Sequence, residues 1–430
     1  MPLRLDTRSP DFTTRFSAFL GTKREVSEDV VQAVARIIED VRVRGDAALI
    51  DFSQKFDRVD LGALGIRVTE AEIDAAIEVA DKATYEALEF AHGRIRAHHQ
   101  KQLPASGRYV DPIGVELGHR WTAVDAVGLY VPGGTAAYPS SVLMNAVPAK
   151  VAGVERLAMV VPAPDGVLNP MVLAAARLAG VDEVYRVGGA QAIAALAYGT
   201  ATIAPVAKIV GPGNAYVAAA KRHVFGTVGI DMVAGPSEVL VIADGAQNPD
   251  WIAADLLAQA EHDTAAQSIL MTDDDALAEA VIAAVERQLV TLPRRAIASQ
   301  SWQDFGAVIR LNSLDEAPAL ANRLAPEHLE IMCEGAEALA ERIRHAGAIF
   351  IGAHTPEAIG DYVGGSNHVL PTARSARFSS GLGVLDFMKR TSILKCGPDQ
   401  LRALGPAAIA LGEAEGLGAH ARSVAIRLNL

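Results

Sequence analysis

The chain has 430 residues, half of them hydrophobic and 21% charged, and its 39 Lys and Arg against 51 Asp and Glu give a formal net charge of −12. This composition is typical of a folded globular protein, and the acidic balance argues against nucleic acid as a partner, because phosphate groups require a basic surface. The sequence shows no signal segment and no stretch of ~18 apolar residues, and its only cysteines are Cys333 and Cys396. It therefore predicts a protein of the reducing cytoplasm that does not enter a membrane.

The first part of the chain is predicted to be an N-terminal helical region. Residues 26–56 and 69–100 place apolar side chains at i, i+3, i+4 spacing, and Ser27 and Thr69 are suited to cap the two stretches. We therefore expect helices over the first ~120 residues.

From residue 123 onward, short β-rich runs alternate with Ala-rich helical runs, which is the pattern of βαβ units and a parallel sheet. Strands are predicted in a first series at 123–131, 156–162, 182–189 and 207–213, and in a second series at 239–244, 268–273, 306–311 and 346–352. The predicted fold is α/β, with two doubly wound, incomplete Rossmann-like domains that meet near residues 229–238. Such sheets bind ligands outside the carboxyl ends of their strands.

Two further segments follow the second series. Residues 354–396 are polar, Gly-rich and without periodicity, and a loop of that length in a compact domain usually has a function. The last ~30 residues return to a helical pattern. This C-terminal helical tail packs either on a partner subunit or on its own domain.

Three glycine turns join a strand to a helix in the first series, at Gly133-Gly134, Gly188-Gly189 and Gly211-Pro212-Gly213. Such turns let a phosphate approach the N-terminus of a helix, although any βα unit can also change direction in this way. None of the turns fits the G-x-G-x-x-G dinucleotide fingerprint. The polar side chains that accompany them, and are therefore candidate ligand contacts, are Tyr130, Gln191 and Asn214.

A possible metal site begins at the end of the helical run 249–263. Gln259 and His262 lie three residues apart and therefore on one helix face, which suits two ligands of one metal ion. Asp361, His368 and His420 are candidates for the remaining ligands. The alternative interpretation is a solvated helix end.

Glu327 and His328 follow Pro326 at the end of a helical run. The pair could transfer protons, because histidine titrates near neutrality and burial can raise the pKa of a glutamate toward it. The alternative is a surface glutamate beside a partly buried histidine. Cys333 offers another chemistry, a thiolate that traps an aldehyde as a thiohemiacetal, against the alternative of a buried core cysteine.

Taken in order, these motifs resemble those of one family, the histidinol dehydrogenases. The resemblance spans roughly residues 20 to 430, and the matching segments include GLYVPGGTAAYPSS, VGGAQAIAALAYGT, KIVGPGNAYVAAAK, LLAQAEHD, APEHLEI, GDYVGGSNHVLPT and EGLGAHARSVAIR. It implies a zinc-dependent homodimeric enzyme that oxidises L-histidinol through L-histidinal to L-histidine with two NAD+, the last step of histidine biosynthesis.

The resemblance also implies roles for individual residues. Glu327 and His328 become the catalytic pair, in which His328 removes the alcohol proton and Glu327 activates the water that hydrates the aldehyde. The implied contacts of NAD are Tyr130, Gln191 and Asn214. The implied ligands of zinc are Gln259, His262, Asp361 and His420. The implied contacts of the substrate are Ser237, Gln259, His262, His328, Asp361, Glu415 and His420.

The resemblance divides the chain into an N-terminal arm at 1–27, a metal and substrate domain made of 28–123 and 237–382, an NAD-binding domain at 124–236 and a dimerisation tail at 383–430. The tail is expected to reach across to the partner subunit. Because the dinucleotide fingerprint is missing, NAD is expected to be held loosely. Two rival functions stay open: oxidation of another small polar alcohol, such as a sulfonated diol, and a non-catalytic metal-binding scaffold.

Overall fold

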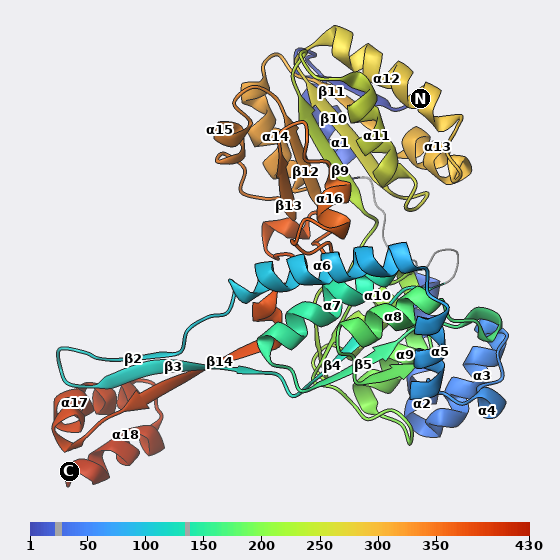
Figure 1. Ribbon diagram of the computed structural model, residues 1–430. Helices are drawn as coiled ribbons and strands as arrows, with labels where there is room; N and C mark the ends of the chain where they lie inside the picture. Colours follow the sequence, from blue (N-terminus) through green and yellow to red (C-terminus); the bar gives the residue numbers. More distant parts are fainter. Residues whose placement is uncertain (22–27, 134–137) are drawn as a thin grey trace.

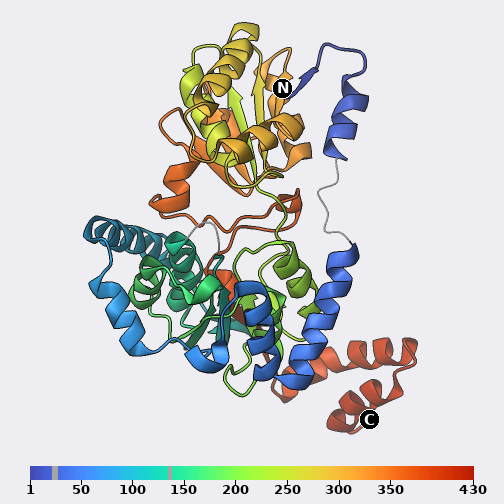
Figure 2. The ribbon, with the colours of Figure 1, turned by 90° about the vertical axis from the view of Figure 1, so that its right-hand side faces the viewer.

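The structure is a computed structural model that describes residues 1–21, 28–133 and 138–430. Two α/β domains lie one above the other, and a narrow arm that ends in two helices projects away from them (Figure 1, Figure 2). Ser27 and Gly134, for which the sequence predicted a helix cap and part of a glycine turn, lie outside the described residues. No helix in the described part of the chain is long and apolar enough to span a bilayer.

The lower domain in Figure 1 is built on a five-stranded parallel sheet with the strand order β6-β5-β4-β7-β8. The strands are β4 (Ala126–Tyr130), β5 (Arg156–Val160), β6 (Glu183–Tyr185), β7 (Lys208–Val210) and β8 (Gly229–Ile230). The helices that wind around them are α7 (Pro139–Ala152), α8 (Pro170–Leu178), α9 (Gly189–Tyr198) and α10 (Ala215–Val224). This sheet confirms the first predicted series of βαβ units.

The N-terminal helices cover this same sheet. They are α2 (Glu28–Arg44), α3 (Asp46–Asp57), α4 (Leu61–Leu64), α5 (Glu70–Glu78) and α6 (Lys82–Gln100). Ile38 and Leu49 are buried with Ile193 of α9, while Leu88 and Ile95 are buried with strand and helix residues on the other side of the sheet. The grouping of 28–123 with 237–382 is therefore corrected, because an amphipathic pattern shows that a helix face is buried but not which sheet buries it.

The upper domain is built on a six-stranded parallel sheet with the order β1-β11-β10-β9-β12-β13. Its strands are β1 (Leu3–Asp6), β9 (Glu238–Ala243), β10 (Gln267–Thr272), β11 (Ala307–Arg310), β12 (His328–Met332) and β13 (Ala348–Ile351). Its helices are α1 (Phe12–Leu20), α11 (Pro249–Ala260), α12 (Asp275–Leu289), α13 (Arg295–Asp304), α14 (Ala317–Leu324), α15 (Ala336–Ala340) and α16 (Glu357–Tyr362). The second predicted series is confirmed, with β12 as an additional strand.

The first twenty residues do not form a free arm. β1 pairs in parallel with β11 at the edge of the six-stranded sheet, and Phe16 of α1 is fully buried in the core of the upper domain. The prediction of an arm at 1–27 is therefore wrong for residues 1–20. The four-residue strand has too short a pattern to be recognised without its distant partner.

The projecting arm holds a three-stranded antiparallel sheet with the order β14-β3-β2, made of β14 (Met388–Lys395), β3 (Glu116–Ala123) and β2 (Gly107–Val110). The helices α17 (Pro398–Ala414) and α18 (Gly418–Ala425) lie on it. The sequence predicted helix up to residue ~120 and a loop at 354–396, and both predictions are wrong at these strands. No residue of the three strands is buried, so they lack the apolar alternation that identifies a strand.

Candidate active site

The predicted catalytic residues lie on the side of the upper domain that faces the lower one, where Figure 1 places α16. β12 begins at His328 and β9 begins at Glu238, so this is the edge formed by the amino ends of the strands. α11 runs back from the opposite edge and brings Gln259 to the same place. The expectation of a site at the carboxyl ends of the strands is therefore wrong for this sheet.

His328 is buried, and its Nδ1 is held by two oxygen atoms. Its Nδ1 lies 3.1 Å from the main-chain oxygen of Glu238 and 3.1 Å from Oε1 of Gln259. Since both of these oxygens are acceptors, the proton of the neutral imidazole belongs on Nδ1. Nε2 lies 3.6 Å from Oδ1 of Asp361 and has no hydrogen-bond partner among the described residues. The free lone pair of Nε2 is therefore suited to accept a proton.

Two buried glutamates stand next to His328. Oε2 of Glu327 accepts a hydrogen bond from the main-chain N–H of Glu238 at 3.0 Å and lies 3.9 Å from Nδ1 of His328. Oε2 of Glu357, the first residue of α16, lies 3.5 Å from the same Nδ1. Sequence reasoning missed Glu357, because it lies in a segment without periodicity that was predicted to be an irregular loop.

The low-dielectric surroundings change the titration of this cluster. Burial raises the pKa of Glu327 to about 7 and that of Glu357 to about 8. Burial by itself lowers the pKa of His328, but the carboxylates of Glu357, Glu327 and Asp361 outweigh it and raise the pKa of the imidazole above its ordinary value. The cluster can therefore hold and release protons near neutral pH.

A second pair of carboxyl groups lies behind Glu357. Glu330, in the middle of β12, is fully buried, and its Oε1 accepts the main-chain N–H of Glu357 at 2.7 Å. The carboxyl group of Asp255 on α11 is a close electrostatic neighbour of Glu330. Burial raises the pKa of Glu330 to about 9 and that of Asp255 to about 6. The acidic residue inside the apolar run HLEIM was the sequence signal that could have identified Glu330.

Three of the four predicted zinc ligands gather around His328. Gln259 and Asp361 both contact its ring, while His262 is exposed at the end of α11. Desolvation by the surrounding protein lowers the pKa of His262, and the nearby Asp361 partly opposes this shift. Amide oxygen, imidazole nitrogen and carboxylate oxygen are donors that Zn2+ accepts, although a zinc site usually has four ligands.

The fourth predicted ligand is not part of this cluster. His420 and Glu415 are exposed on the projecting arm, whose helices α17 and α18 lie away from both domains in Figure 1. Within the described residues, no group of three or more His, Cys, Asp or Glu side chains is placed to hold a metal ion. Ser237, a predicted substrate contact, immediately precedes β9 and is partly buried. One chain thus brings together three of the four predicted zinc ligands.

His368, the alternative ligand considered from the sequence, has a different position. Its Nδ1 lies 2.9 Å from the main-chain oxygen of Asp361, and its Nε2 lies 3.3 Å from Oγ of Ser141 in α7. The neighbouring Asn367 donates a hydrogen bond to the main-chain oxygen of Met144 at 2.7 Å. Both ring nitrogens of His368 are engaged, and the segment connects the candidate metal site to the lower domain.

The three predicted glycine turns meet at the carboxyl edge of the five-stranded sheet. A Cβ atom on Gly188 would lie 2.4 Å from Cβ of Pro162, and one on Gly133 would lie 2.9 Å from Cγ of the same proline. At Gly211, where φ is +109°, a Cβ atom would lie 2.1 Å from the main-chain oxygen of Tyr130. Only glycine permits these close approaches, so the turns are packed together at one edge.

The side chains beside these turns have contacts of their own. The hydroxyl of Tyr130 is buried and accepts a hydrogen bond from the main-chain N–H of Gly189 at 3.1 Å. Gln191 is buried in the first turn of α9. Oδ1 of Asn214 caps α10 by accepting from the main-chain N–H groups of Tyr216 and Val217. These residues thus shape the N-terminal ends of two helices at the sheet edge.

A buried ion pair, missed by sequence reasoning, fixes the third turn. Lys221 of α10 pairs with Asp231, and both side chains are almost fully buried. Asp231 accepts the main-chain N–H of Gly211 at 2.8 Å, and Lys221 donates to the main-chain oxygen of the same glycine at 3.0 Å. The glycine is therefore held on both sides by opposite charges.

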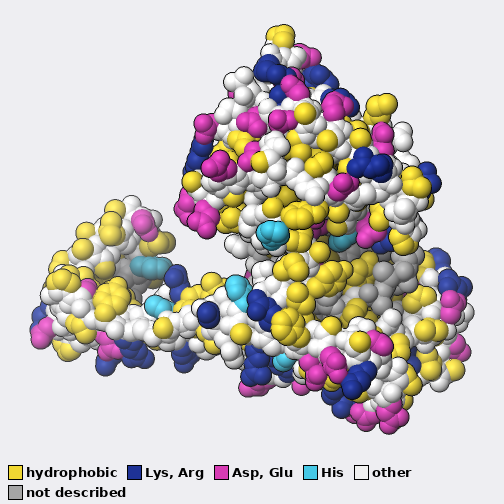
Figure 3. All heavy atoms as spheres, turned by 45° about the horizontal axis from the view of Figure 1, so that its top comes forward, with side chains coloured by type: hydrophobic (Ala, Val, Ile, Leu, Met, Phe, Trp, Pro, Cys, Tyr) yellow, Lys and Arg dark blue, Asp and Glu magenta, His cyan; other side chains and the backbone are white. Residues whose placement is uncertain are grey.

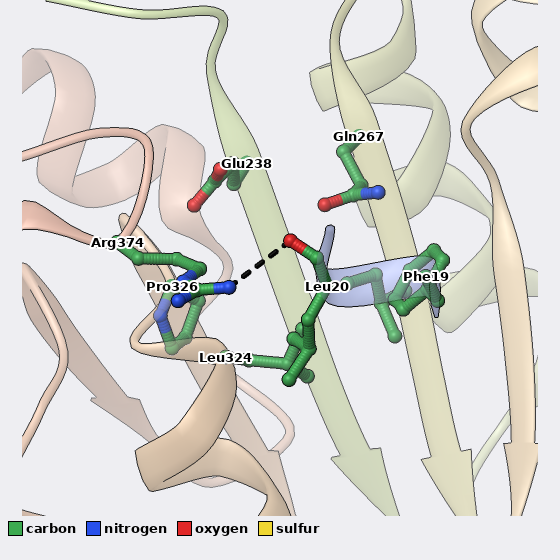
Figure 4. Close-up of a pocket in the computed structure, with 8 residues that line it drawn as sticks. Phe19, Leu20, Glu238, Gln267, Leu324, Pro326 and Arg374 are labelled. Atoms are coloured by element: carbon green, nitrogen blue, oxygen red, sulfur yellow. Dashed lines mark hydrogen bonds between the residues drawn. The ribbon is translucent and has the colours of Figure 1, made fainter. Parts of the chain in front are cut away.

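Two cavities border the site without containing the catalytic pair. One, of 30 Å3, lies beside Pro326 and Glu238, and Figure 4 shows Arg374 closing it by a 3.0 Å hydrogen bond to the main-chain oxygen of Leu20. It has room for about one water molecule. The other, of 580 Å3, lies between α6 and β13, with Arg94 and Phe350 in its lining. Glu327 and His328 line neither of these two cavities.

Cys333 lies at the opposite end of β12 from His328, and a strand of five residues is about 16 Å long. Burial also raises the pKa of its thiol to about 11, so that it stays protonated near neutral pH. These two facts exclude the thiohemiacetal chemistry considered from the sequence.

The pKa of Glu330 gives a testable effect on stability. A carboxyl whose pKa is raised from 4.5 to about 9 in the folded protein stabilises the fold at low pH and loses that contribution as the pH rises. Glu330→Gln keeps an oxygen for the N–H of Glu357 but cannot ionise. We expect the melting temperature of Glu330→Gln, relative to that of the wild type, to increase as the pH rises from about 5 to about 9. Circular dichroism measures both melting temperatures.

The control is Glu334→Gln, since Glu334 is exposed at the far end of β12. Its melting temperature should differ from that of the wild type by a constant amount over the same pH range. Parallel curves for Glu330→Gln and the wild type would contradict the raised pKa.

Comparison with known proteins shows similarity along almost the whole chain. A family model described as "Histidinol dehydrogenase" matches residues 21–428. The histidinol dehydrogenases of Bradyrhizobium diazoefficiens and Brucella suis biovar 1 are each 71% identical over 430 residues, with 100% of both chains covered. The crystal structure of histidinol dehydrogenase from Elizabethkingia anophelis is similar with a TM-score of 0.95 at 37% identity, covering 100% of this chain and 98% of that one. The similarity thus includes both domains and the arm.

Proposed function

Because the chain belongs to the histidinol dehydrogenase family and is therefore an oxidoreductase, we propose that it oxidises L-histidinol to L-histidine through L-histidinal, the last step of histidine biosynthesis. Two NAD+ molecules are the hydride acceptors, and zinc is the resident metal. The observation that carries the proposal is the state of His328. Its Nδ1 faces two oxygen acceptors, and its buried Nε2 is free beside Asp361.

The oxidation of the alcohol needs a base as hydride leaves the carbon. Nε2 of His328 accepts the hydroxyl proton, and the positive charge that develops on the ring is stabilised by Glu357 and Asp361 at 3.5 Å and 3.6 Å. These carboxylates raise the pKa of His328 against the effect of burial, so the ring readily keeps the proton that it accepts.

The oxidation of the aldehyde needs a water molecule, because only the hydrated aldehyde has a second hydride to give. Glu327 activates this water. Burial raises its pKa to about 7, so that a fraction of the carboxyl groups is ionised and basic near neutral pH. Its hydrogen bond from the main-chain N–H of Glu238 fixes one oxygen and leaves the other for water.

The amide, imidazole and carboxylate donors described above are types that zinc accepts, but they are three and a zinc site usually has four ligands. Gln259, His262 and Asp361 would hold the ion, which would orient the imidazole and amino nitrogens of the substrate. The fourth donor, His420, would come from the partner subunit, and Glu415 of the same tail would join Ser237 in contacting the substrate.

The surface of the arm supports a homodimer with exchanged tails. Only Gly405, Gly412 and Ala421 are buried in α17 and α18. Apolar side chains instead cover the outside of the arm in Figure 3. The large exposed ones on and beside its two helices include Leu394, Leu404, Leu411, Leu417, Ile426 and Leu430. A pair of helices on a three-stranded sheet without its own core needs another surface to cover it.

NAD would bind at the carboxyl edge of the five-stranded sheet, in the domain at 124–236. The glycine turns lie at this edge, where they join strands to the N-termini of helices, and Tyr130, Gln191 and Asn214 stand beside them. Since the dinucleotide fingerprint is missing, the cofactor is held loosely enough for NADH to be exchanged for NAD+ while the aldehyde stays bound.

The test of the function is the formation of NADH when the purified protein is mixed with histidinol and NAD+. We expect an absorbance increase that is lost with a chelator and restored by zinc. A signal only with another polar alcohol, such as a sulfonated diol, would favour the first rival. No signal with any alcohol would favour the scaffold.

The role of Glu327 predicts a selective effect. Glu327→Gln should slow the oxidation of histidinal by roughly 10²-fold or more and affect the oxidation of histidinol less, because only the former needs activated water. NADH formation is measured from each substrate separately, with Glu334→Gln as the control. Normal rates for both half-reactions would show that the assignment is wrong.

Tail exchange predicts complementation between two inactive variants. His262→Asn removes a ligand from the main body of the subunit that carries it, and His420→Asn removes a ligand from the tail of the other subunit. In the mixed dimer, one of the two sites therefore combines an intact main body with an intact tail. Random pairing after co-expression should therefore restore about a quarter of the wild-type activity. His262→Asn mixed with Gln259→Ala should stay inactive, because both changes lie in the main body. An inactive first mixture would contradict tail exchange.

A further inference from the structure

The third glycine turn of the lower domain, residues 211–213, carries an inference that rests on the proposed function and its NAD site. The turn joins β7 to α10 at the carboxyl edge of the five-stranded sheet. Asn214, a proposed contact of NAD, follows the turn directly and caps α10. The conformation of the turn therefore decides where this contact lies.

We propose that Lys221 and Asp231 are positioning residues for NAD, because their buried ion pair fixes Gly211 and thereby the N-terminal end of α10. Neither side chain needs to touch the cofactor. The pair acts through the backbone of the turn, so its loss weakens the binding of NAD and leaves the binding of histidinol at the other domain unchanged.

The pair holds one residue of the turn from both sides. Oδ2 of Asp231 accepts the main-chain N–H of Gly211 at 2.8 Å, while Oδ1 accepts the main-chain N–H of Met232 at 2.6 Å. Nζ of Lys221 donates to the main-chain oxygen of Gly211 at 3.0 Å and pairs with the carboxylate of Asp231. Both polar groups of the Gly211 main chain are thus bound by charged side chains.

Gly211 has a conformation that depends on such contacts. Its φ is +109°, in a region that glycine adopts far more readily than other residues. A Cβ atom there would lie 2.1 Å from the main-chain oxygen of Tyr130, the proposed NAD contact at the end of β4. Since glycine has the greatest backbone freedom of all residues, the ion pair restricts a position that has no side chain to restrict it.

The two side chains are themselves carried by regular structure. Lys221 lies in α10, and Asp231 directly follows β8. The main-chain N–H of Asp231 donates to the main-chain oxygen of Ile209 in β7 at 3.2 Å. Helices and strands hold side chains more precisely than loops do, so the pair ties the turn to the rigid part of the domain.

The burial of the pair indicates that it acts by position and not by attracting the phosphates of NAD. The side chains of Lys221 and Asp231 are 2% and 1% exposed. The carboxylate neutralises the ammonium, which leaves little net charge for a phosphate group. Because burying two charges has a desolvation cost that an apolar pair would avoid, the pair is better explained by the conformation that it sets than by stability.

The structural alternative is that the pair only stabilises the lower domain. The double variant Lys221→Met/Asp231→Asn separates the two roles. It leaves no unpaired buried charge, so we expect it to fold with a melting temperature near that of the wild type. The amide of Asn can still accept the N–H of Gly211, but the main-chain oxygen of this glycine loses its charged donor.

The experiment uses the full-length protein and two readouts. The first is the dissociation constant of NADH, measured by the change of its fluorescence on binding in the absence of substrate. The second is the KM for NAD+ and for histidinol in the zinc-loaded enzyme. We expect the double variant to raise the Kd of NADH and the KM for NAD+ roughly ten-fold, as the loss of one charge-assisted hydrogen bond would, with an unchanged KM for histidinol.

The single variant Asp231→Asn tests the pair in a second way. It leaves the ammonium of Lys221 buried without its counter-charge, which is strongly destabilising. We expect a lower melting temperature by circular dichroism than for the double variant, together with weaker binding of NADH. A double variant less stable than this single variant would contradict the ion pair.

The matched control is Arg156→Met, in a partly buried pair with Glu183 at the amino ends of β5 and β6, the opposite edge of the same sheet. Like Lys221, Arg156 also donates to main-chain oxygens, those of Ala204 and Pro205. The control should lower the melting temperature and leave the Kd of NADH at the wild-type value.

The outcomes separate the positioning role from the function. A wild-type enzyme that does not oxidise histidinol would overturn the proposed function, while the Kd of NADH would still test the pair. An unchanged Kd of NADH in the double variant would overturn the positioning role alone. An equal rise in the KM for histidinol, or the same loss of NADH binding in Arg156→Met, would also overturn it, since either would indicate a general loss of structure.

Discussion

Everything around the candidate site depends on the burial of one imidazole among carboxyl groups. The main-chain oxygen of Glu238 and the amide oxygen of Gln259 set the orientation of His328, while Glu327, Glu357 and Asp361 determine its charge. Because burial disfavours the ionised carboxylate, the pKa of Glu327 rises to about 7 and that of Glu357 to about 8. This shift gives the cluster its capacity for acid and base chemistry.

The two sheets face each other with different edges. The carboxyl edge of the five-stranded sheet, which carries the glycine turns, faces the upper domain (Figure 1). The amino edge of the six-stranded sheet, which carries His328, faces the lower domain. His368 connects the two by contacts to Asp361 and to Ser141 of α7. The proposed NAD site at the first edge and the proposed substrate site at the second therefore face each other, as hydride transfer requires.

The arm has a different physical character from the two domains. Its sheet has no buried residue and its helices bury only small ones. A single chain therefore leaves the apolar surface of the arm without cover, and it brings together only three of the four predicted zinc ligands. In the proposed dimer, the packing of the arm on a second copy of the chain would cover this surface and supply the fourth ligand.

The sequence by itself determined the elements with strong local patterns, namely the βαβ units of both sheets, the amphipathic helices and the family, and it identified Glu327, His328, Gln259, His262 and Asp361 as chemically suited residues. Only the tertiary structure decided that the N-terminal helices cover the five-stranded sheet, that β1 joins the six-stranded one and that β3 pairs with β14. It alone placed Glu357, Glu330 and Asp255 behind the imidazole. The reason is that periodicity records whether a residue is buried, whereas the partner that buries it is set by contacts between segments far apart in the chain.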